Sequence, residues 1–403
     1  MKRPAILLVS MAVPALMAAA ALAADPPTDG AMSLVQTITI EKPEAAQNAG
    51  LRSVRVHGRF VYLHPQAHGK LLWYRRGDDG LLVEAGSMEM KLDKGVSQSG
   101  MVFVGERLYM VRLGPGRAGR PVHVVWYQVD PETGRPTEKG LLDAKVTAFP
   151  SVSYEPLVVS PDGKQLYLLA ANRAGGSKVV WFQLDASGRP SVGGQVAGEG
   201  IGFAAKLLGD TSLRVSPDGR HVYTISGDDH KLAILQRGED GSLKHVKAVD
   251  LAVVAPKPGP PDSKAWNQTF SWPGLAISPD GKFVYVNLWA YGNSQGNVIG
   301  LFRRDGDSGE LTFVEKLKWP AALKGFSIAF SPDGRYAYMG HLNGPAVHAR
   351  RDPATGRLTP LASFPQTNGP ERRGPCIYDM TLDAKAGYAY FADVYGKLFV
   401  FKR

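Results

Sequence analysis

Short runs of alternating hydrophobic and polar residues recur along this chain, and turn sequences separate them. Alternation at every second position is typical of a strand with one buried face, and the proline and glycine between the runs indicate tight turns. The turn sequence SPDG occurs four times, beginning at residues 160, 216, 278 and 331. Its proline presets φ, and its glycine can adopt the left-handed conformation that closes a hairpin. The pattern therefore predicts repeated β-hairpins.

A tyrosine in the strand that follows each turn extends the series to seven units. These residues are Tyr62, Tyr109, Tyr167, Tyr223, Tyr285, Tyr338 and Tyr390. Their spacing ranges from 47 residues (62 to 109) to 62 residues (223 to 285), as in a repeat with loops of variable length. In the fifth unit the predicted strands are residues 274–278, 282–288, 297–304 and 311–317. Seven units of four strands predict an all-β fold, a seven-bladed β-propeller of antiparallel blades.

The first and last predicted strands complete each other. Residues 397–403 are the third strand of the seventh unit, and residues 34–41 form a strand that belongs to no unit. We expect residues 34–41 to be the outer strand of the last blade, where they would close the ring and cover an exposed edge. The prediction is one propeller domain over residues 24–403, with an inserted loop at 254–274.

The first 23 residues resemble a secretory signal peptide. Lys2 and Arg3 precede an apolar stretch that ends with the small-residue pattern Ala21-Leu22-Ala23. We expect cleavage after Ala23, the alternative being an N-terminal membrane anchor. No later apolar run is long enough to span a membrane, so the mature protein is expected to be periplasmic or secreted, without a membrane span.

The charge balance narrows the expected partners. The chain carries 47 Lys and Arg against 37 Asp and Glu, a formal net charge of +10. The basic residues are scattered and do not alternate with stacking aromatics, so we do not expect nucleic acid as a partner. A small anionic molecule, an anionic envelope polymer or a protein partner fits better. The single cysteine, Cys376, excludes an internal disulfide and a cysteine metal site.

The segments SPDGKQLYLLAANR, SPDGKFVYVNL and SPDGRYAYMGH resemble repeats of the seven-bladed β-propeller lactonase family. This family includes 6-phosphogluconolactonases and carboxymuconate-cyclising enzymes, and the repeats also resemble the wider class of exported propellers with a tyrosine-valine repeat. The resemblance implies the propeller fold and the hydrolysis or isomerisation of a lactone. The histidine that the family usually places ahead of the repeat turn is absent from all four SPDG segments.

The candidate chemistry lies on the face opposite the SPDG turns, where second strands end and loops lead to the next strand or blade. Glu155 and Asp379 are candidate general bases, and His341 is a candidate base or metal ligand; a structural role is the alternative for each. His64 also ends a second strand. The candidate substrate-binding residues are Arg112, Arg173, Asn172, Asn287, Trp289, Tyr291 and Asp393.

The candidate residues favour anionic ligands. Arg112 and Arg173 could hold a carboxylate or phosphate through paired donors, or could be solvated loop charges. The oxygen donors are of the type that calcium prefers, so a divalent cation such as calcium is one expectation and no cofactor is the other. The oxygen-donor set is Glu155, Asn172, Asp228, Asn287 and Asp393.

Two classes of function remain open on the sequence. One is an exported lactonase-type hydrolase or cycloisomerase, in which a carboxylate or histidine activates water and arginines stabilise the oxyanion. The other is a non-catalytic exported propeller that binds a ligand, an envelope polymer or a protein partner.

Overall fold

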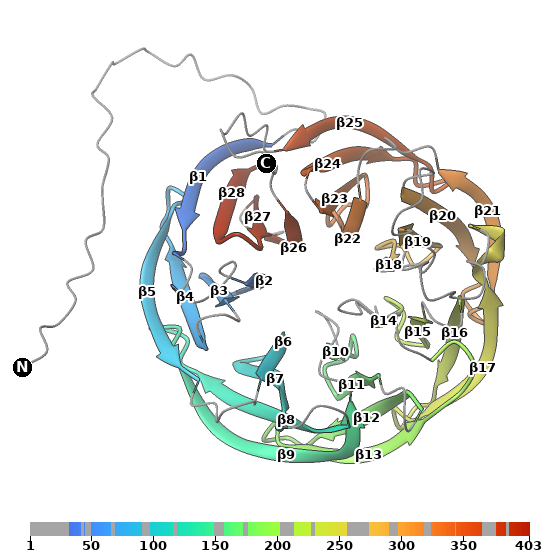
Figure 1. Ribbon diagram of the computed structural model, residues 1–403, viewed down its shortest axis with the longest axis horizontal. Helices are drawn as coiled ribbons and strands as arrows, with labels where there is room; N and C mark the ends of the chain where they lie inside the picture. The colour runs from blue at the N-terminus through green and yellow to red at the C-terminus, as the bar shows by residue number, and fades with distance from the viewer. Residues whose placement is uncertain are drawn as a thin grey trace, which may run out of the picture.

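Seven four-stranded antiparallel sheets form a ring of blades around a central axis (Figure 1). The computed structural model describes residues 32–41, 44, 50–65, 69–90, 97–115, 119–148, 157–171, 176–201, 213–226, 230–255, 274–289, 297–317, 324–342, 344–364, 376–383 and 387–403. In these ranges the only helical element is the 3-10 turn η2 (Leu251–Val253). No helix in the described part of the chain has the length and apolar character needed to cross a membrane. The predicted all-β seven-bladed propeller is confirmed.

Within a blade, the strands run from the axis outward in chain order. Blade 1 has β2 (Leu51–His57), β3 (Phe60–Pro65), β4 (Lys70–Arg76) and β5 (Leu82–Glu89); blade 2 has β6 (Ser97–Val104), β7 (Arg107–Leu113), β8 (Arg120–Val129) and β9 (Pro136–Ala148). Blade 3 has β10 (Leu157–Val159), β11 (Gln165–Ala170), β12 (Lys178–Leu184) and β13 (Pro190–Val196); blade 4 has β14 (Leu213–Val215), β15 (His221–Ser226), β16 (Lys231–Arg237) and β17 (Leu243–Asp250).

The remaining blades follow the same order. Blade 5 has β18 (Gly274–Ile277), β19 (Phe283–Trp289), β20 (Asn297–Arg304) and β21 (Leu311–Leu317); blade 6 has β22 (Lys324–Phe330), β23 (Tyr336–Leu342), β24 (Gly344–Arg351) and β25 (Leu358–Phe364). Blade 7 has β26 (Ile377–Asp383), β27 (Tyr388–Asp393), β28 (Lys397–Lys402) and, outermost, β1 (Ser33–Thr39). The four strands predicted for the fifth unit correspond to β18–β21. Most of the inserted loop at 254–274 lies outside the described residues.

The first strand of the chain closes the ring, as predicted. β1 pairs antiparallel with β28, from Ser33 opposite Lys402 to Thr39 opposite Lys397. The strand also contacts blade 1, because the Gln36 side chain donates to the Leu82 carbonyl (2.9 Å) and accepts from the Leu82 N–H (2.8 Å). Because β1 pairs along the length of β28, with one irregularity between Leu34 and Gln36, the last blade presents no unpaired third strand.

The seven repeat tyrosines are fully buried, and five of them link one blade to the next. Five of them donate from the hydroxyl to a glycine carbonyl in the turn between the third and fourth strands of the following blade. These pairs are Tyr62–Gly134, Tyr109–Gly188, Tyr167–Gly241, Tyr223–Gly309 and Tyr285–Gly356, at 2.6–3.0 Å. Burial raises the pKa of Tyr285 to about 12, so the hydroxyl keeps its proton and remains a donor.

An arginine at the end of the third strand adds a second link at three successive junctions. In blade 6, Arg351 donates to the Tyr285 hydroxyl (3.1 Å), to the Gly334 carbonyl (3.0 Å) and to the Asp280 carboxylate (2.8 Å). Asp280 is the aspartate of an SPDG turn in blade 5. Arg237 and Arg304 make the same three contacts at the preceding junctions, with Asp162 and Asp218. The SPDG aspartate therefore joins neighbouring blades as well as favouring its own turn.

Where the ring closes, other arginines replace this contact. Blade 7 has no turn between its third strand and β1, and there Arg403 pairs with Asp333 of blade 6 at 3.1 Å. At the junction of blades 7 and 1, Arg76 pairs with Asp383. Both junctions that include blade 7 are thus held by an arginine–aspartate pair.

Replacing Arg351 with methionine is expected to destabilise the propeller. Its side chain is 1% exposed, so the change leaves Asp280 and the Tyr285 hydroxyl without their cationic partner. We expect a loss of about 3 kcal/mol in the free energy of unfolding, measured by urea denaturation. Arg357→Met removes an exposed pair with Glu315 and is the control, with little change expected. Equal stability of the two variants would contradict the role given to Arg351.

Candidate functional site

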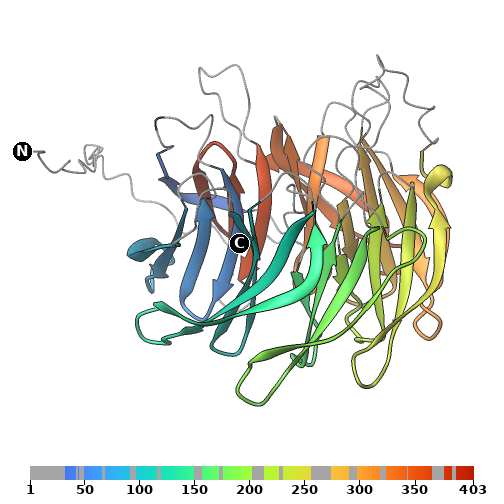
Figure 2. The same cartoon turned by 60° about the horizontal axis from the view of Figure 1, so that its bottom comes forward.

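The two faces of the ring differ in their polar groups. The turns within the SPDG hairpins and the outer hairpins lie together on one face, while η2, yellow in Figure 2, lies on the opposite face. On this opposite face the second strands of the blades end. Their preceding residues form fully buried apolar runs such as β11 and β27, so a polar residue at the strand end is conspicuous.

Five second strands have a buried polar side chain among their last three residues. These residues are His64, Ser226, Asn287, His341 and Asp393, each 0–3% exposed. They come from blades 1, 4, 5, 6 and 7, so they are distributed around much of the ring. Because a few polar groups on a rigid apolar scaffold are typical of small-molecule sites, this set is the best candidate for a site among the described residues.

His64 has an unusual environment. Burial lowers the pKa of its imidazole to about 4, so the ring is neutral at neutral pH. Its Nδ1 atom and the buried Oγ atom of Ser53, on the adjacent strand β2, have no hydrogen-bond partner among the described residues. A neutral imidazole and a hydroxyl at the end of blade 1 could therefore accept and donate hydrogen bonds to a bound molecule.

Asp379, a predicted general base, is held by several donors. Its Oδ2 atom accepts from Arg55 Nη1 (2.5 Å) and from the Val54 N–H (2.9 Å), and its Oδ1 atom accepts from the Met380 N–H (2.9 Å). The carboxylate is 7% exposed and Arg55 is 19% exposed. These contacts give Asp379 a structural role between blades 7 and 1, while its catalytic role stays a prediction.

Arg55 was not among the residues singled out from the sequence. It lies on the innermost strand of blade 1, and its Nε atom also donates to the Met101 carbonyl of blade 2 (3.0 Å). Its guanidinium therefore bridges the inner strands of blades 7, 1 and 2. Arg214 occupies the same register position in blade 4, because Arg55 and Arg214 lie opposite the repeat tyrosines Tyr62 and Tyr223. The signal in the sequence was an arginine where other units have Val, Ala or Thr.

The described substrate-binding candidates are in different settings. Arg112 pairs with Glu138 at 3.1 Å and donates to Gln98 at 3.2 Å, within blade 2. Asp393 accepts from the N–H groups of Cys376 and Tyr395, both at 3.1 Å, and so stabilises the turn after β27.

Asn287 and His341 are fully buried within β19 and β23, and β19 ends at Trp289, which pairs with Asn297. Glu155, Asn172, Arg173 and Tyr291 lie outside the described residues, as does Asp228. Their roles therefore stay predictions. Among the described residues no three His, Cys, Asp or Glu side chains gather as a metal site.

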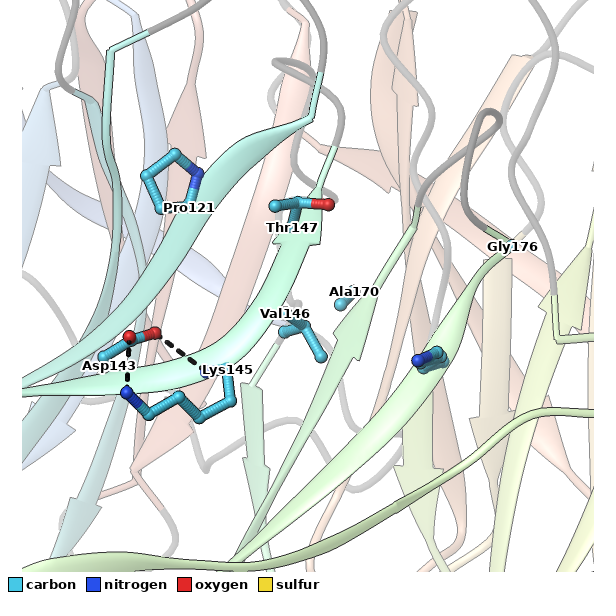
Figure 3. Close-up of a pocket in the computed structure, with 8 residues that line it drawn as sticks. Pro121, Asp143, Lys145, Val146, Thr147, Ala170 and Gly176 are labelled. Carbon is cyan, nitrogen blue, oxygen red and sulfur yellow. Dashed lines mark hydrogen bonds and ion pairs between the residues drawn. The ribbon is translucent and has the colours of Figure 1, made fainter.

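Grooves also run between the outer parts of neighbouring blades. One, of about 370 Å³, lies between blades 2 and 3 and is lined by Lys145, Thr147, Ala170 and Lys178 among others. Figure 3 shows Asp143 and Lys145 paired on β9 beside it, at 3.0 Å between Oδ2 and Nζ. Lys145 has a positive φ of 58°, at a bulge in β9. These grooves are separate from the polar strand ends near the axis.

Comparison with known proteins confirms the resemblance indicated by the repeats. The family model "Lactonase, 7-bladed beta-propeller" matches residues 213–372, which span blades 4 to 6. No curated protein sequence matches the chain.

Solved structures share the fold. A candidate 6-phosphogluconolactonase from Bacteroides uniformis is similar with a TM-score of 0.56 and 16% identity, over 80% of this chain and 84% of that one. Another from Bacteroides fragilis has a TM-score of 0.53 and 17% identity, over 91% and 89%. Hydrazine synthase from Kuenenia stuttgartiensis has a TM-score of 0.59 and 12% identity, over 92% and 99%. At such identities the likeness extends to the fold, and function has to be argued from the site.

The buried state of His64 predicts a pH dependence of stability. Because its pKa is lowered in the folded protein, the unfolded chain binds a proton first as the pH falls below about 6.5, and stability is lost from there toward pH 4. Between pH 7 and pH 5 we expect His64 to account for a loss of about 2 kcal/mol, absent in His64→Leu. Guanidinium unfolding of parent and variant at both pH values measures it, and the same pH slope in the two proteins would contradict it.

Proposed function

We propose that this lactonase-family propeller binds a small anionic molecule, a lactone or the corresponding hydroxy acid, on the face opposite the SPDG turns, and hydrolyses it there. The observation that carries the proposal is the set of buried polar side chains at the ends of five second strands, on that one face. A few convergent polar groups on a rigid apolar scaffold are typical of small-molecule sites. The family resemblance supplies the class of substrate.

The chemistry requires a base, an anchor for the anion and a donor for the oxyanion. In lactone hydrolysis the water oxygen bonds to the carbonyl carbon, the ring C–O bond breaks, and the ring oxygen leaves as a hydroxyl after taking a proton. His341 and Glu155 are the proposed bases that remove the proton from water. Arg55 near the axis is the proposed anchor for a carboxylate or phosphate, and Asp379 orients its guanidinium.

Binding without turnover is the second candidate. It is favoured by the pairing of predicted site residues with other groups of the protein, as Asp379 with Arg55 and Arg112 with Glu138. A carboxylate already held by a guanidinium is a weaker base for water. In this case the same face would bind an anionic ligand, an envelope polymer or a protein partner.

We also propose that the protein is exported, with residues 1–23 removed as a signal peptide. The pattern of Lys2, Arg3 and the apolar stretch up to Ala23 supports this. N-terminal sequencing of the protein recovered from the periplasm or medium is expected to begin at Ala24. An intact N-terminus on membrane-bound protein would instead indicate an anchor.

Hydrolysis is tested by a screen of anionic sugar lactones, with acid release followed in a pH-stat, before and after treatment with a chelator. We expect turnover by the parent, with kcat lowered about 100-fold in His341→Ala and in Glu155→Gln. Arg55→Met is expected to raise KM, because the anchor for the anion is lost. His245→Ala, on the outer strand β17, is the control and should leave both constants unchanged.

The outcomes separate the two candidates. No turnover of any lactone, together with calorimetric binding of an anionic lactone or hydroxy acid that Arg55→Met weakens, would support the binding protein. Neither turnover nor binding would overturn the proposal as a whole. If chelation alone abolishes turnover, a metal activates the water and the bases act with it.

A further inference from the structure

A second site is indicated between blades 2 and 3, on the outer side of the ring and away from the polar strand ends. A groove of about 480 Å³ lies there, lined by residues of both blades. Its principal lining residues are Arg107, Trp126, Gln128, Lys139, Ser187 and Arg189. It combines an aromatic ring with three cationic side chains, a combination that the proposed function does not use.

The indole of Trp126 is fixed against the backbone of the neighbouring strand. Trp126 on β8 lies opposite Gly140 on β9, and a Cβ atom on Gly140 would lie 2.5 Å from the Cζ2 and Cη2 atoms of the ring. Only glycine allows this close approach. The side chain is half-buried, so the part of the ring that does not contact β9 lies along the groove. The groove therefore has a rigid apolar surface.

The side chains that line the groove around the Trp126 indole carry an excess of positive charge. The lining includes Arg107, Lys139 and Arg189 and no acidic residue. None of the three cations forms an ion pair in the described part of the chain. The acidic groups nearest in sequence already have partners. Asp185 accepts from the Ser187 hydroxyl (2.6 Å) and the Arg189 N–H (2.9 Å) at the rim of the groove, Glu106 pairs with His57, and Glu138 pairs with Arg112.

The cationic surface continues along β9. Lys139 lines this groove, and Lys145, on the same strand, lines the groove of about 370 Å³ together with Lys178 of blade 3. Six residues of extended strand correspond to about 20 Å. Asp143 pairs with Lys145 in that groove, so the excess of positive charge is concentrated at Arg107, Lys139 and Arg189, and Lys178 extends it along the junction of blades 2 and 3.

The equivalent groove between blades 1 and 2 differs in the burial of its tryptophan and in the balance of its charges. Trp73 contacts Gly86 in the same way, but it is 4% exposed and its Nε1 atom donates to the Thr133 carbonyl at 3.1 Å. Its lining contains Arg135 and also Glu138, so the charges balance. Of the two grooves, therefore, only the one between blades 2 and 3 has a half-buried indole and an excess of cations.

We propose that the groove between blades 2 and 3 binds an acidic oligosaccharide. The carbon-bound hydrogens of a sugar ring form an apolar face that packs on an indole. Carboxylate groups along the saccharide pair with Arg107, Lys139 and Arg189. Gln128 donates through its amide nitrogen to the carbonyls of Glu106 and Val129, so its Oε1 atom can accept a sugar hydroxyl.

An acidic saccharide fits better than a single-stranded nucleic acid. The groove offers one indole where the bases of a strand stack on successive aromatic side chains. Gln128 and Ser187 supply polar contacts suited to a ligand with many hydroxyls.

The test is calorimetric titration of the full chain with oligogalacturonates, with neutral maltooligosaccharides of the same length as the comparison. We expect binding of the acidic series only, weakened by high salt. Lys139→Ala combined with Arg189→Ala should weaken it about tenfold, since two charged contacts are lost. Arg135→Ala is the matched control, because Arg135 takes the place of Arg189 in the preceding blade, and should change affinity less than twofold, about the error of the titration.

Trp126→Phe keeps an aromatic ring but reduces its area, and we expect intermediate affinity, with a small loss of stability because Trp126 also packs against the core; thermal unfolding verifies that the variant is folded at the titration temperature. Equal binding of neutral and acidic saccharides, no binding of either, or equal weakening by Arg135→Ala would each overturn the proposal. Tighter binding of a single-stranded oligonucleotide that the same double variant abolishes would also overturn it, in favour of nucleic acid. Lactone turnover is measured separately, and its presence or absence does not alter these outcomes.

Discussion

The arginine that joins each of blades 4, 5 and 6 to the blade before it is the interaction on which much of the ring depends. In blades 4, 5 and 6 it binds a tyrosine hydroxyl, a turn carbonyl and an aspartate from two different blades. A buried guanidinium is costly unless its donors are satisfied, so its geometry fixes how one blade stands against the next. Apolar side chains make most of the contacts between neighbouring blades, and the arginine fixes the position of one blade relative to the next.

This arrangement separates the links between blades from the polar strand ends that carry the proposed site. The arginine–aspartate links gather at the face with the SPDG turns, where they hold the ends of the blades. The opposite face is then free to vary at the ends of its strands, because the packing is already fixed below it. There the buried imidazoles and amides on β3, β19 and β23 replace the apolar residues that fill the rest of these strands. The outer grooves differ from one blade junction to another, because their lining comes largely from side chains of the third and fourth strands that are not part of these links.

Local patterns in the sequence were sufficient for the fold. SPDG, the repeat tyrosine and alternating apolar residues identify each hairpin, and counting strands predicts that β1 completes blade 7. Partners across the blades could not be predicted, because they are distant in the chain: Arg351 and Asp280 are 71 residues apart, and Arg55 and Asp379 are 324 apart. From the sequence, Asp379 was therefore a candidate general base. In the structure its carboxylate pairs with the guanidinium of Arg55. Position near a strand end follows from the repeat alone, and on that basis His64, Asn287, His341 and Asp393 could be singled out; their roles stay predictions.

The pairing of β1 with β28 has a consequence for how the protein comes to be folded. Ser33 and Lys402 are neighbours in space but lie at opposite ends of the described chain, and Arg403 completes the contact between blades 6 and 7. Contacts between distant residues form late, because the entropy of closing a long loop has to be overcome first. Six blades can pack while the chain is still being made, but the ring stays open until residues 397–402 are available. Without them β1 has no partner and the outer edge of β27 is exposed, so an unpaired strand edge marks a ring that has not closed.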